Sequence, residues 1–289
     1  MNIKSRRIQM AAVQMEITAG RPDENIARAI WLVGHAVADG AQVVVLPELF
    51  ITGFDYECAA AFPQRRTDAC LRELRAIAKH NSVVIVAGSV VTRAKGSHER
   101  SVRSKTSTKS LHNTCHIIGS DGRTKAVYHK LHPFPLMDED LHFRPGTALA
   151  VANTRFGTIA PCICFDIRFP EVTRRLALSG AQILAVPAEF PHPRLHHWYA
   201  LLRARAIENQ VFVIAANRVG RDRTGDFFGH SMIVSPTGEL VAEAGEDEAV
   251  LMGLIDLGEV ESARKAIPCL DRINPAVAIP VTKKPSRKK

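Results

Sequence analysis

The sequence predicts an α/β protein in which helices cover mixed β-sheets. Apolar blocks typical of strands alternate along the chain with amphipathic blocks typical of helices. Two pairs of strands are joined by short turns, at 120–122 and 235–238, so antiparallel neighbours are expected beside the parallel ones. The run Val43–Leu46 is rich in β-branched residues, which is typical of a strand buried on both faces.

The first half of the chain contains two predicted helices among its strands. The helix expected at 22–39 begins with Pro22, which suits a first turn, and stops at Gly40. The helix expected at 68–80 carries its apolar residues on one face. The strands expected here are 8–13, 43–46, 83–91, 111–118 and 124–128, the last two forming a hairpin.

The second half repeats this alternation. Helices are expected at 171–178 and 195–209, and the first of them is closed by Gly180. The expected strands are 158–164, 183–186, 211–216, 232–234, 240–242 and 251–255. Because no linker interrupts residues 1–270, we expect one domain over 1–272 and a C-terminal extension, 273–289, that ends in a basic tail.

The net charge of +9 is concentrated in two short segments. Segment 93–109 holds six basic residues and one acidic residue, and tail 283–289 holds five basic residues and no acidic one. The rest of the chain is nearly neutral, whereas a nucleic-acid-binding protein usually carries its basic face on the folded body. Nucleic acid is therefore not an expected partner. The tail suits either a weak contact with an acidic surface or a solubilising role.

The sequence also indicates the cellular compartment and argues against one kind of metal site. No apolar run approaches the roughly 18 residues that a membrane span needs. The basic start of the chain is not followed by a long apolar core, so a secretory signal is not expected. None of the six cysteines forms a C-x-x-C pair, which argues against a zinc site of that spacing. We expect a cytoplasmic, reduced protein without metal, in which most cysteines are buried.

Segment 161–171 offers a candidate nucleophile. An apolar strand is expected to end at Cys164, and a helix begins a few residues later. A side chain at such a turn is presented outward, while backbone N–H groups of the turn point toward the same space. A thiol there needs a nearby base or cation for activation. Cys162, inside the expected strand and on the same face, is the alternative; a simply buried Cys164 is another.

Three charged positions are candidate partners of this thiol. Glu48 follows the buried strand 43–46, where α/β sheets place active groups. Lys130 follows the second strand of the expected hairpin. Glu139 comes nine residues later between Asp138 and Asp140. Taken singly, each residue is as well explained by an exposed position on the surface.

Together these segments resemble the nitrilase superfamily of carbon–nitrogen hydrolases, over nearly the whole chain from 7 to 268. The motifs that carry the resemblance are Pro47-Glu48-Leu49-Phe50, Tyr128-His129-Lys130-Leu131-His132 and Cys164-Phe165-Asp166-Ile167-Arg168-Phe169-Pro170-Glu171. Segments 205–210 and 229–234 support it. The resemblance implies a four-layer α-β-β-α sandwich with two mixed sheets, and a homodimer or higher homo-oligomer formed through helices.

The resemblance also implies roles for the charged residues. Cys164 would attack the carbonyl carbon of a small-molecule amide, and Glu48 would be the general base. Lys130 and the backbone N–H of Phe165 would stabilise the oxyanion, and Glu139 would orient Lys130 or the substrate. The nucleophile position is followed by Phe165-Asp166, whereas true nitrilases typically have Trp-Glu there, so nitrile hydrolysis is disfavoured. The chemistry needs no metal or organic cofactor.

Segments 137–143 and 197–202 resemble ω-amidases, which release ammonia from the amide of a short 2-oxo dicarboxylic acid. Such a substrate needs a cation for its free carboxylate, and the candidates are Arg168, Arg194 and His196. Phe190 and Trp198 are candidate pocket walls. Surface ion pairing for the first three, and core packing for the two aromatic residues, are the alternatives.

Two other amide-cleaving activities remain open from the sequence: hydrolysis of an N-carbamoyl group and hydrolysis of deaminated glutathione. A different class of function, a scaffold or binding protein that uses the basic segment 93–109 and the tail, is the non-enzymatic alternative. The long Ser/Thr/Lys/Arg segment departs from the short loop usual in the superfamily.

Overall fold

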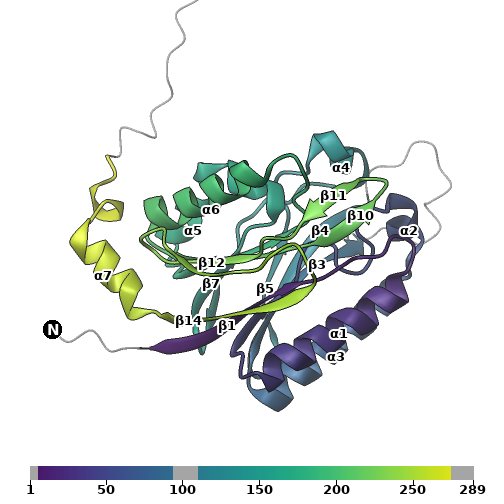
Figure 1. Ribbon diagram of the computed structural model, residues 1–289, viewed down its shortest axis with the longest axis horizontal. Coiled ribbons are helices and arrows are strands. Elements are labelled where there is room, and N and C mark those ends of the chain that lie inside the picture. Colours follow the sequence, from purple (N-terminus) through teal and green to yellow (C-terminus); the bar gives the residue numbers. More distant parts are fainter. Residues whose placement is uncertain (1–5, 94–109, 275–289) are drawn as a thin grey trace, which may run out of the picture.

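The computed structural model describes residues 6–93 and 110–274 and contains two six-stranded mixed sheets (Figure 1). The first sheet contains, in spatial order, β14 (Ala249–Asp256), β1 (Arg7–Gln14), β2 (Val43–Val45), β3 (Val84–Arg93), β4 (Leu111–Ile118) and β5 (Thr124–His129). The second contains β13 (Leu240–Glu243), β12 (Met232–Val234), β9 (Phe212–Asn217), β8 (Ile183–Ala188), β7 (Gly157–Pro161) and β6 (Ala152–Thr154). A separate ribbon pairs β10 (Val219–Asp222) with β11 (Gly225–Phe228).

Helices cover the outer face of each sheet, which gives the predicted four-layer α-β-β-α sandwich. In Figure 1, α1 (Pro22–Ala38) and α3 (Gln64–Asn81) lie against the first sheet, and α5 (Pro170–Leu178) and α6 (Leu195–Asn209) lie against the second. The remaining short helices are α2 (Tyr56–Ala61), η2 (Pro135–Met137), α4 (Glu139–His142), η3 (Cys164–Arg168), α7 (Gly258–Ala266) and η4 (Leu270–Arg272).

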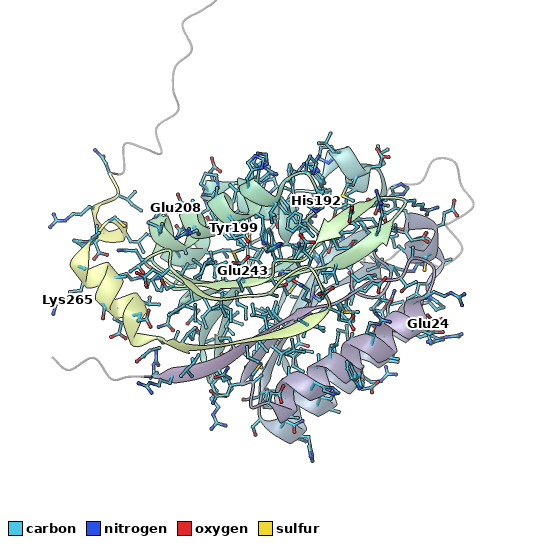
Figure 2. All side chains as sticks on the ribbon, viewed as in Figure 1. Glu24, His192, Tyr199, Glu208, Glu243 and Lys265 are labelled. Atoms are coloured by element: carbon cyan, nitrogen blue, oxygen red, sulfur yellow. The ribbon has the colours of Figure 1, made fainter. Side chains whose placement is uncertain are left out.

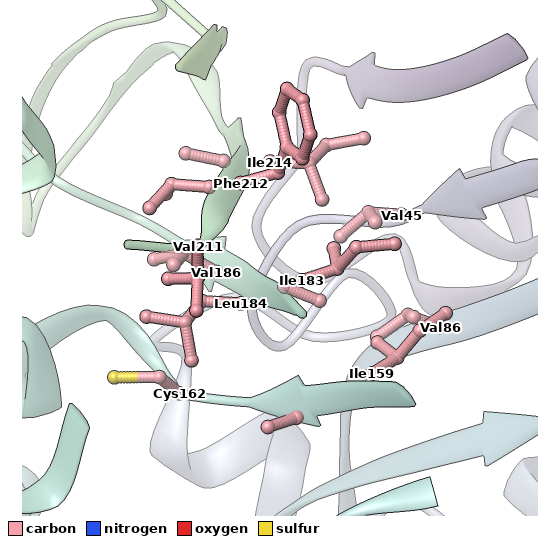
Figure 3. Close-up of a cluster of buried hydrophobic side chains, with 14 of the residues drawn as sticks. Val45, Val86, Ile159, Cys162, Ile183, Leu184, Val186, Val211, Phe212 and Ile214 are labelled. Carbon is pink, nitrogen blue, oxygen red and sulfur yellow. The ribbon is translucent and has the colours of Figure 1, made fainter. Parts of the chain in front are cut away.

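The alternation of side chains along each strand divides the buried residues between two interfaces. Val43 and Val45 of β2 join the cluster that includes the strands of the second sheet, whereas Val44 joins the cluster that includes α1 and α3. The strand is therefore buried on both faces, as its composition predicts. Figure 3 shows the part of the core where Val45 and Val86 of one sheet face Ile159 and Ile183 of the other. Side chains fill the space between the sheets (Figure 2).

Most predicted elements are confirmed, with ends that differ by a few residues. Helix 195–209 and the hairpin 111–118/124–128 agree closely, and α3 begins four residues earlier than expected. The expected strand 158–164 is too long, because β7 ends at Pro161. The elements that sequence patterns did not predict are α2, α4, α7, β6, β10 and β11, together with the three short 3-10 turns.

Pro161 is the last residue of β7, which lies between β6 and β8 and is therefore not an edge strand. The amide of Cys162 donates to Ala185 of β8, so the nitrogen of Pro161 points to the opposite side. There the β6 ladder stops at Ile159. Proline therefore costs no ladder hydrogen bond at this position.

The two basic segments that the sequence singles out lie outside the described residues, or nearly so. The residues concerned are 94–109, which is nearly all of the basic loop, and the basic tail 283–289. Over the described ranges 6–93 and 110–274, no helix combines the length and the apolar composition needed to cross a membrane.

Candidate active site

The predicted catalytic residues come together where strands of both sheets end. Glu48 follows β2, Lys130 follows β5 and Cys164 follows β7, while Glu139 opens α4. All four side chains are at most 5% exposed. Carboxyl ends of strands from two sheets, together with the start of α4, thus place a thiol, an ammonium group and two carboxylates in one buried site.

The turn that carries Glu48 is fixed by a bulge in the neighbouring strand β3. Ser89 of this bulge accepts a hydrogen bond from the amide of Leu49 through its Oγ (2.8 Å), and its own amide donates to the carbonyl of Pro47 (3.1 Å). A Cβ on Gly88 would lie 2.0 Å from that carbonyl oxygen, so only glycine permits the approach. Leu49 has a φ of +42°, which is strained for a branched side chain.

Lys130 bridges the two carboxylates. Its Nζ donates to Glu48 Oε1 (2.7 Å) and to Glu139 Oε2 (2.6 Å). Asn113 on β4 repeats this bridge, because its Nδ2 donates to Glu48 Oε1 (2.7 Å) and to Glu139 Oε1 (2.8 Å). An ammonium group has three N–H bonds, so one remains for a substrate oxygen.

Electrostatics keep this cluster charged in spite of its burial. Burial by itself lowers the pKa of Lys130, but the neighbouring carboxylates Glu139 and Glu48 outweigh it and hold that pKa well above the usual value. The pKa of Glu139 is raised, mainly by burial, while Lys130 opposes the rise. The two carboxylates therefore favour the charged form of Lys130, which in turn opposes the rise in the pKa of the Cys164 thiol.

Cys164 and Cys162 point to different environments. Cys162 belongs to the apolar core, where Figure 3 shows it among aliphatic side chains. The expectation that both cysteines share one strand face is wrong, because the strand has already ended and Cys164 opens η3 with a φ of +44°. Burial and then the negative charge of Glu48 raise the pKa of the Cys164 thiol, while Lys130 and the Glu189 amide oppose the rise.

The loop before α4 fixes Glu139 rather than its acidic neighbour Asp138. Glu139 Oε2 also accepts from the amide of Phe134 (2.6 Å), whereas Asp138 is exposed. Tyr56 of α2 donates its hydroxyl hydrogen to the carbonyl of Met137 (2.5 Å) and stacks on His142 at 4.0 Å. These contacts hold the loop against the rest of the site.

A small pocket opens beside Cys164. Its lining residues combine aromatic rings, one carboxylate and two arginines: Phe134, Cys164, Phe165, Arg168, Glu189, Phe190, Pro191 and Arg194. The guanidinium of Arg168 lies 5.3 Å from the ring centre of Phe190, and that of Arg194 lies 5.5 Å from the ring centre of Phe134. The pocket is therefore narrow, aromatic and positively charged, which suits a short acyl group with an anionic end.

Two predicted binding residues are not among those that line this pocket. Trp198 is fully buried, donates its Nε1–H to the carbonyl of His230 (2.8 Å) and packs behind Phe190. His196 is exposed and lies against His197. Among residues 6–93 and 110–274, no group of three or more His, Cys, Asp or Glu side chains is arranged to hold a metal ion.

A family model for carbon–nitrogen hydrolases matches residues 9–265, which is most of the chain. The chain belongs to the carbon–nitrogen hydrolase family. This confirms the resemblance indicated by the three motifs. The protein is a hydrolase acting on carbon–nitrogen bonds other than peptide bonds.

Relatives in this family support the amidase branch. The chain is 37% identical to the 2-oxoglutaramate amidase of Bacillus subtilis over 91% of this chain and 96% of that protein. It is 30% identical to the omega-amidase NIT2 of Homo sapiens over 90% and 92%. The structure is similar to that of Nit3 of Saccharomyces cerevisiae, a member of branch 10 of the nitrilase superfamily, with a TM-score of 0.80, 27% identity and coverage of 93% and 97%.

Three buried polar residues near the site of this carbon–nitrogen hydrolase were not predicted from the sequence: Asn113, Glu189 and Arg218. Glu189 follows the apolar strand β8 as Glu48 follows β2, so the same signal was available for both. Asn113 lies inside a strand whose other inward residues are apolar, and such an interruption also marks a functional position.

Proposed function

We propose that this carbon–nitrogen hydrolase is an ω-amidase-like enzyme that releases ammonia from the amide of a short 2-oxo dicarboxylic acid. The observation that carries the proposal is the position of two arginines, Arg168 and Arg194, in the small pocket beside Cys164. A buried thiol next to a carboxylate and an ammonium group suits acyl transfer from an amide. The arginines suit the free carboxylate at the other end of such a substrate.

In the proposed acylation step, Glu48 takes the proton of the Cys164 thiol while sulfur attacks the amide carbon. The carbonyl oxygen becomes an oxyanion, which receives the third N–H of Lys130 and the backbone N–H of Phe165. Glu48 then returns the proton to the leaving nitrogen, so the carbon–nitrogen bond breaks and ammonia departs. The product is a thioester on Cys164.

In the proposed deacylation step, a water molecule takes the place that ammonia leaves. Glu48 removes a proton from this water, the hydroxyl oxygen attacks the thioester carbon, and the carbon–sulfur bond breaks. The proton returns to the sulfur of Cys164. Lys130 remains charged throughout, because two carboxylates surround it.

Ammonia release from 2-oxoglutaramate by the purified protein tests this function. Rapid release supports the proposal. If that compound is inert while an N-carbamoyl compound yields carbon dioxide and ammonia, or deaminated glutathione is hydrolysed, the substrate class is overturned and the family chemistry stands. Inactivity toward all three would overturn the proposed substrate class and leave the family assignment unchanged.

Replacing Arg168 by alanine should raise KM for the 2-oxo acid amide by about 10- to 100-fold, because a charged hydrogen bond contributes roughly 1.5–3 kcal/mol. The kcat value should change little, and a neutral short-chain amide such as propionamide should be hydrolysed as before. Arg175→Ala is the matched control, because Arg175 is exposed on α5 and lines a different groove. Equal increases of KM for the charged and the neutral amide would contradict this carboxylate subsite.

We also propose that the enzyme is a homodimer joined through α5 and α6. Leu178 at the end of α5 and Ile207 near the end of α6 are more than half exposed, although both are large apolar residues. Such side chains on adjacent helices suit burial against a second copy of the chain.

The substitution Ile207→Asp should convert the dimer to a monomer, because the new carboxylate would lose its hydration in an apolar interface. Sedimentation velocity measures the change, and Leu254→Asp on β14, equally exposed but on another face, is the control. An unchanged sedimentation coefficient in Ile207→Asp, or equal dissociation in the control, would exclude this interface.

The six cysteines are all free thiols, and four of them are buried. We infer a reducing compartment and propose the cytoplasm. We also propose residues 1–272 as the hydrolase domain and 273–289 as an extension outside it.

A further inference from the structure

A buried ion pair borders the candidate active site, and neither of its side chains takes part in the proposed reaction. Glu189 follows β8 and Arg218 follows the neighbouring strand β9, and both side chains are almost completely buried. Arg218 Nη1 donates to Glu189 Oε2 (2.8 Å), and its Nη2 donates to the carbonyl of Ile17 (2.6 Å) and to Asp222 Oδ2 (2.7 Å). Because apolar residues of similar volume are often as stable as a buried pair, its presence here calls for a reason other than stability.

The main chain of Glu189 connects this pair to the catalytic residues. Its amide donates to Glu48 Oε2 (3.1 Å), while Lys130 and Asn113 both bind the other oxygen, Oε1. The same amide lowers the pKa of the Cys164 thiol, so it lies within reach of both the base and the nucleophile. One N–H thus faces the two atoms between which the first proton moves.

Residues at the end of β9 fix this peptide and the residue that follows it. Asn217 accepts from the amide of Phe190 through Oδ1 (2.7 Å) and donates to the Phe190 carbonyl through Nδ2 (3.2 Å). The amide of Arg218 donates to the carbonyl of Ala188 (3.2 Å). The guanidinium also packs against Gly53, where a Cβ would lie 3.3 Å from Arg218 Nη1. The pair therefore joins the turn after β8 to the turn that carries Glu48.

We propose that Glu189 and Arg218 are positioning residues, whose ion pair fixes the Glu189 peptide so that its N–H holds Glu48 Oε2 against the sulfur of Cys164. This inference rests on the proposed function, in which Glu48 accepts the thiol proton. When the proton moves to Glu48, the N–H can turn from Oε2 to the thiolate, and its donation to the new negative charge favours transfer. Displacement of this peptide should slow the chemical step more than it weakens substrate binding.

The test compares the double variant Glu189→Gln/Arg218→Met with the single variant Glu189→Gln. The double variant removes the ion pair but keeps similar volumes, whereas in the single variant the glutamine side chain can still accept a hydrogen bond from Arg218. Two quantities are measured: the rate at which iodoacetamide alkylates Cys164 as a function of pH, and kcat and KM for the amide. Circular dichroism verifies that each variant is folded.

In the double variant, the midpoint of the alkylation profile should move to higher pH, and kcat should fall about tenfold or more while KM changes little. Glu189→Gln, which keeps an acceptor for Arg218 but loses the charge, should show both effects more weakly than the double variant. If the double variant does not fold, Arg218→Lys, which keeps the charge but loses the forked geometry, should show both effects more weakly. A folded variant with unchanged alkylation midpoint and kcat would overturn the proposal. Since alkylation requires no substrate, failure of the proposed amide substrate is distinguishable from failure of this inference.

Discussion

Cys164→Ala should abolish ammonia release, with a loss of at least about 10⁴-fold in kcat, because removing a catalytic nucleophile leaves only binding and oxyanion stabilisation. The fold should persist, since the change deletes one atom beside a pocket. Ammonia release measured alongside the thermal unfolding midpoint separates the two effects. A variant that retains substantial turnover would remove Cys164 from the mechanism.

Cys162→Ala is the matched control for this prediction. The two thiols are two residues apart and both are buried, but only Cys164 is among the residues that line the pocket. Deletion of the Cys162 sulfur should cost about 1 kcal/mol of stability, as for other small core deletions, and leave kcat within a factor of a few. If Cys162→Ala lost turnover while remaining folded, the assignment of the nucleophile would have to be reversed.

The sequence located Glu48, Lys130 and Cys164 because each follows a strand and belongs to a motif with a fixed order in the superfamily. A strand pattern by itself could not tell that these three ends meet, since β2 and β5 belong to one sheet and β7 to the other. The resemblance supplied that information. The long periodic elements were also predictable, because an apolar stripe or a β-branched run extends over many residues.

What the sequence could not supply is the environment of single polar residues. Asn113, Glu189 and Arg218 are ordinary residue types, and their contacts join segments that are far apart in the chain, such as Asn113 with Glu48. Elements of three or four residues, such as β6 and α4, are too short to show a period. The position of the turn at Cys164 was predicted from the sequence, but its backbone conformation was not, because no sequence pattern indicates a φ of +44° there.

Lys130→Met should lower both activity and stability. Two carboxylates that now share one ammonium group would face each other in a buried site, which is expected to cost about 3–5 kcal/mol at neutral pH. Loss of the oxyanion donor should reduce kcat by roughly 10²- to 10³-fold or more. Urea unfolding and ammonia release at one temperature measure the two losses separately.

The pH dependence of that instability reveals its cause. Without the lysine, the carboxyl pKa of folded Glu139 should rise further above the ordinary value of 4.5, so the folded state binds more protons than the unfolded state. The free energy of unfolding should therefore increase as pH falls from neutral toward 5, more steeply than in the wild type. Lys130→Met/Glu139→Gln should recover much of the stability but not the turnover, because one negative charge is gone while the oxyanion donor is still absent. If the loss of stability did not depend on pH, and Glu139→Gln did not reduce it, Lys130 would act through packing rather than through its charge.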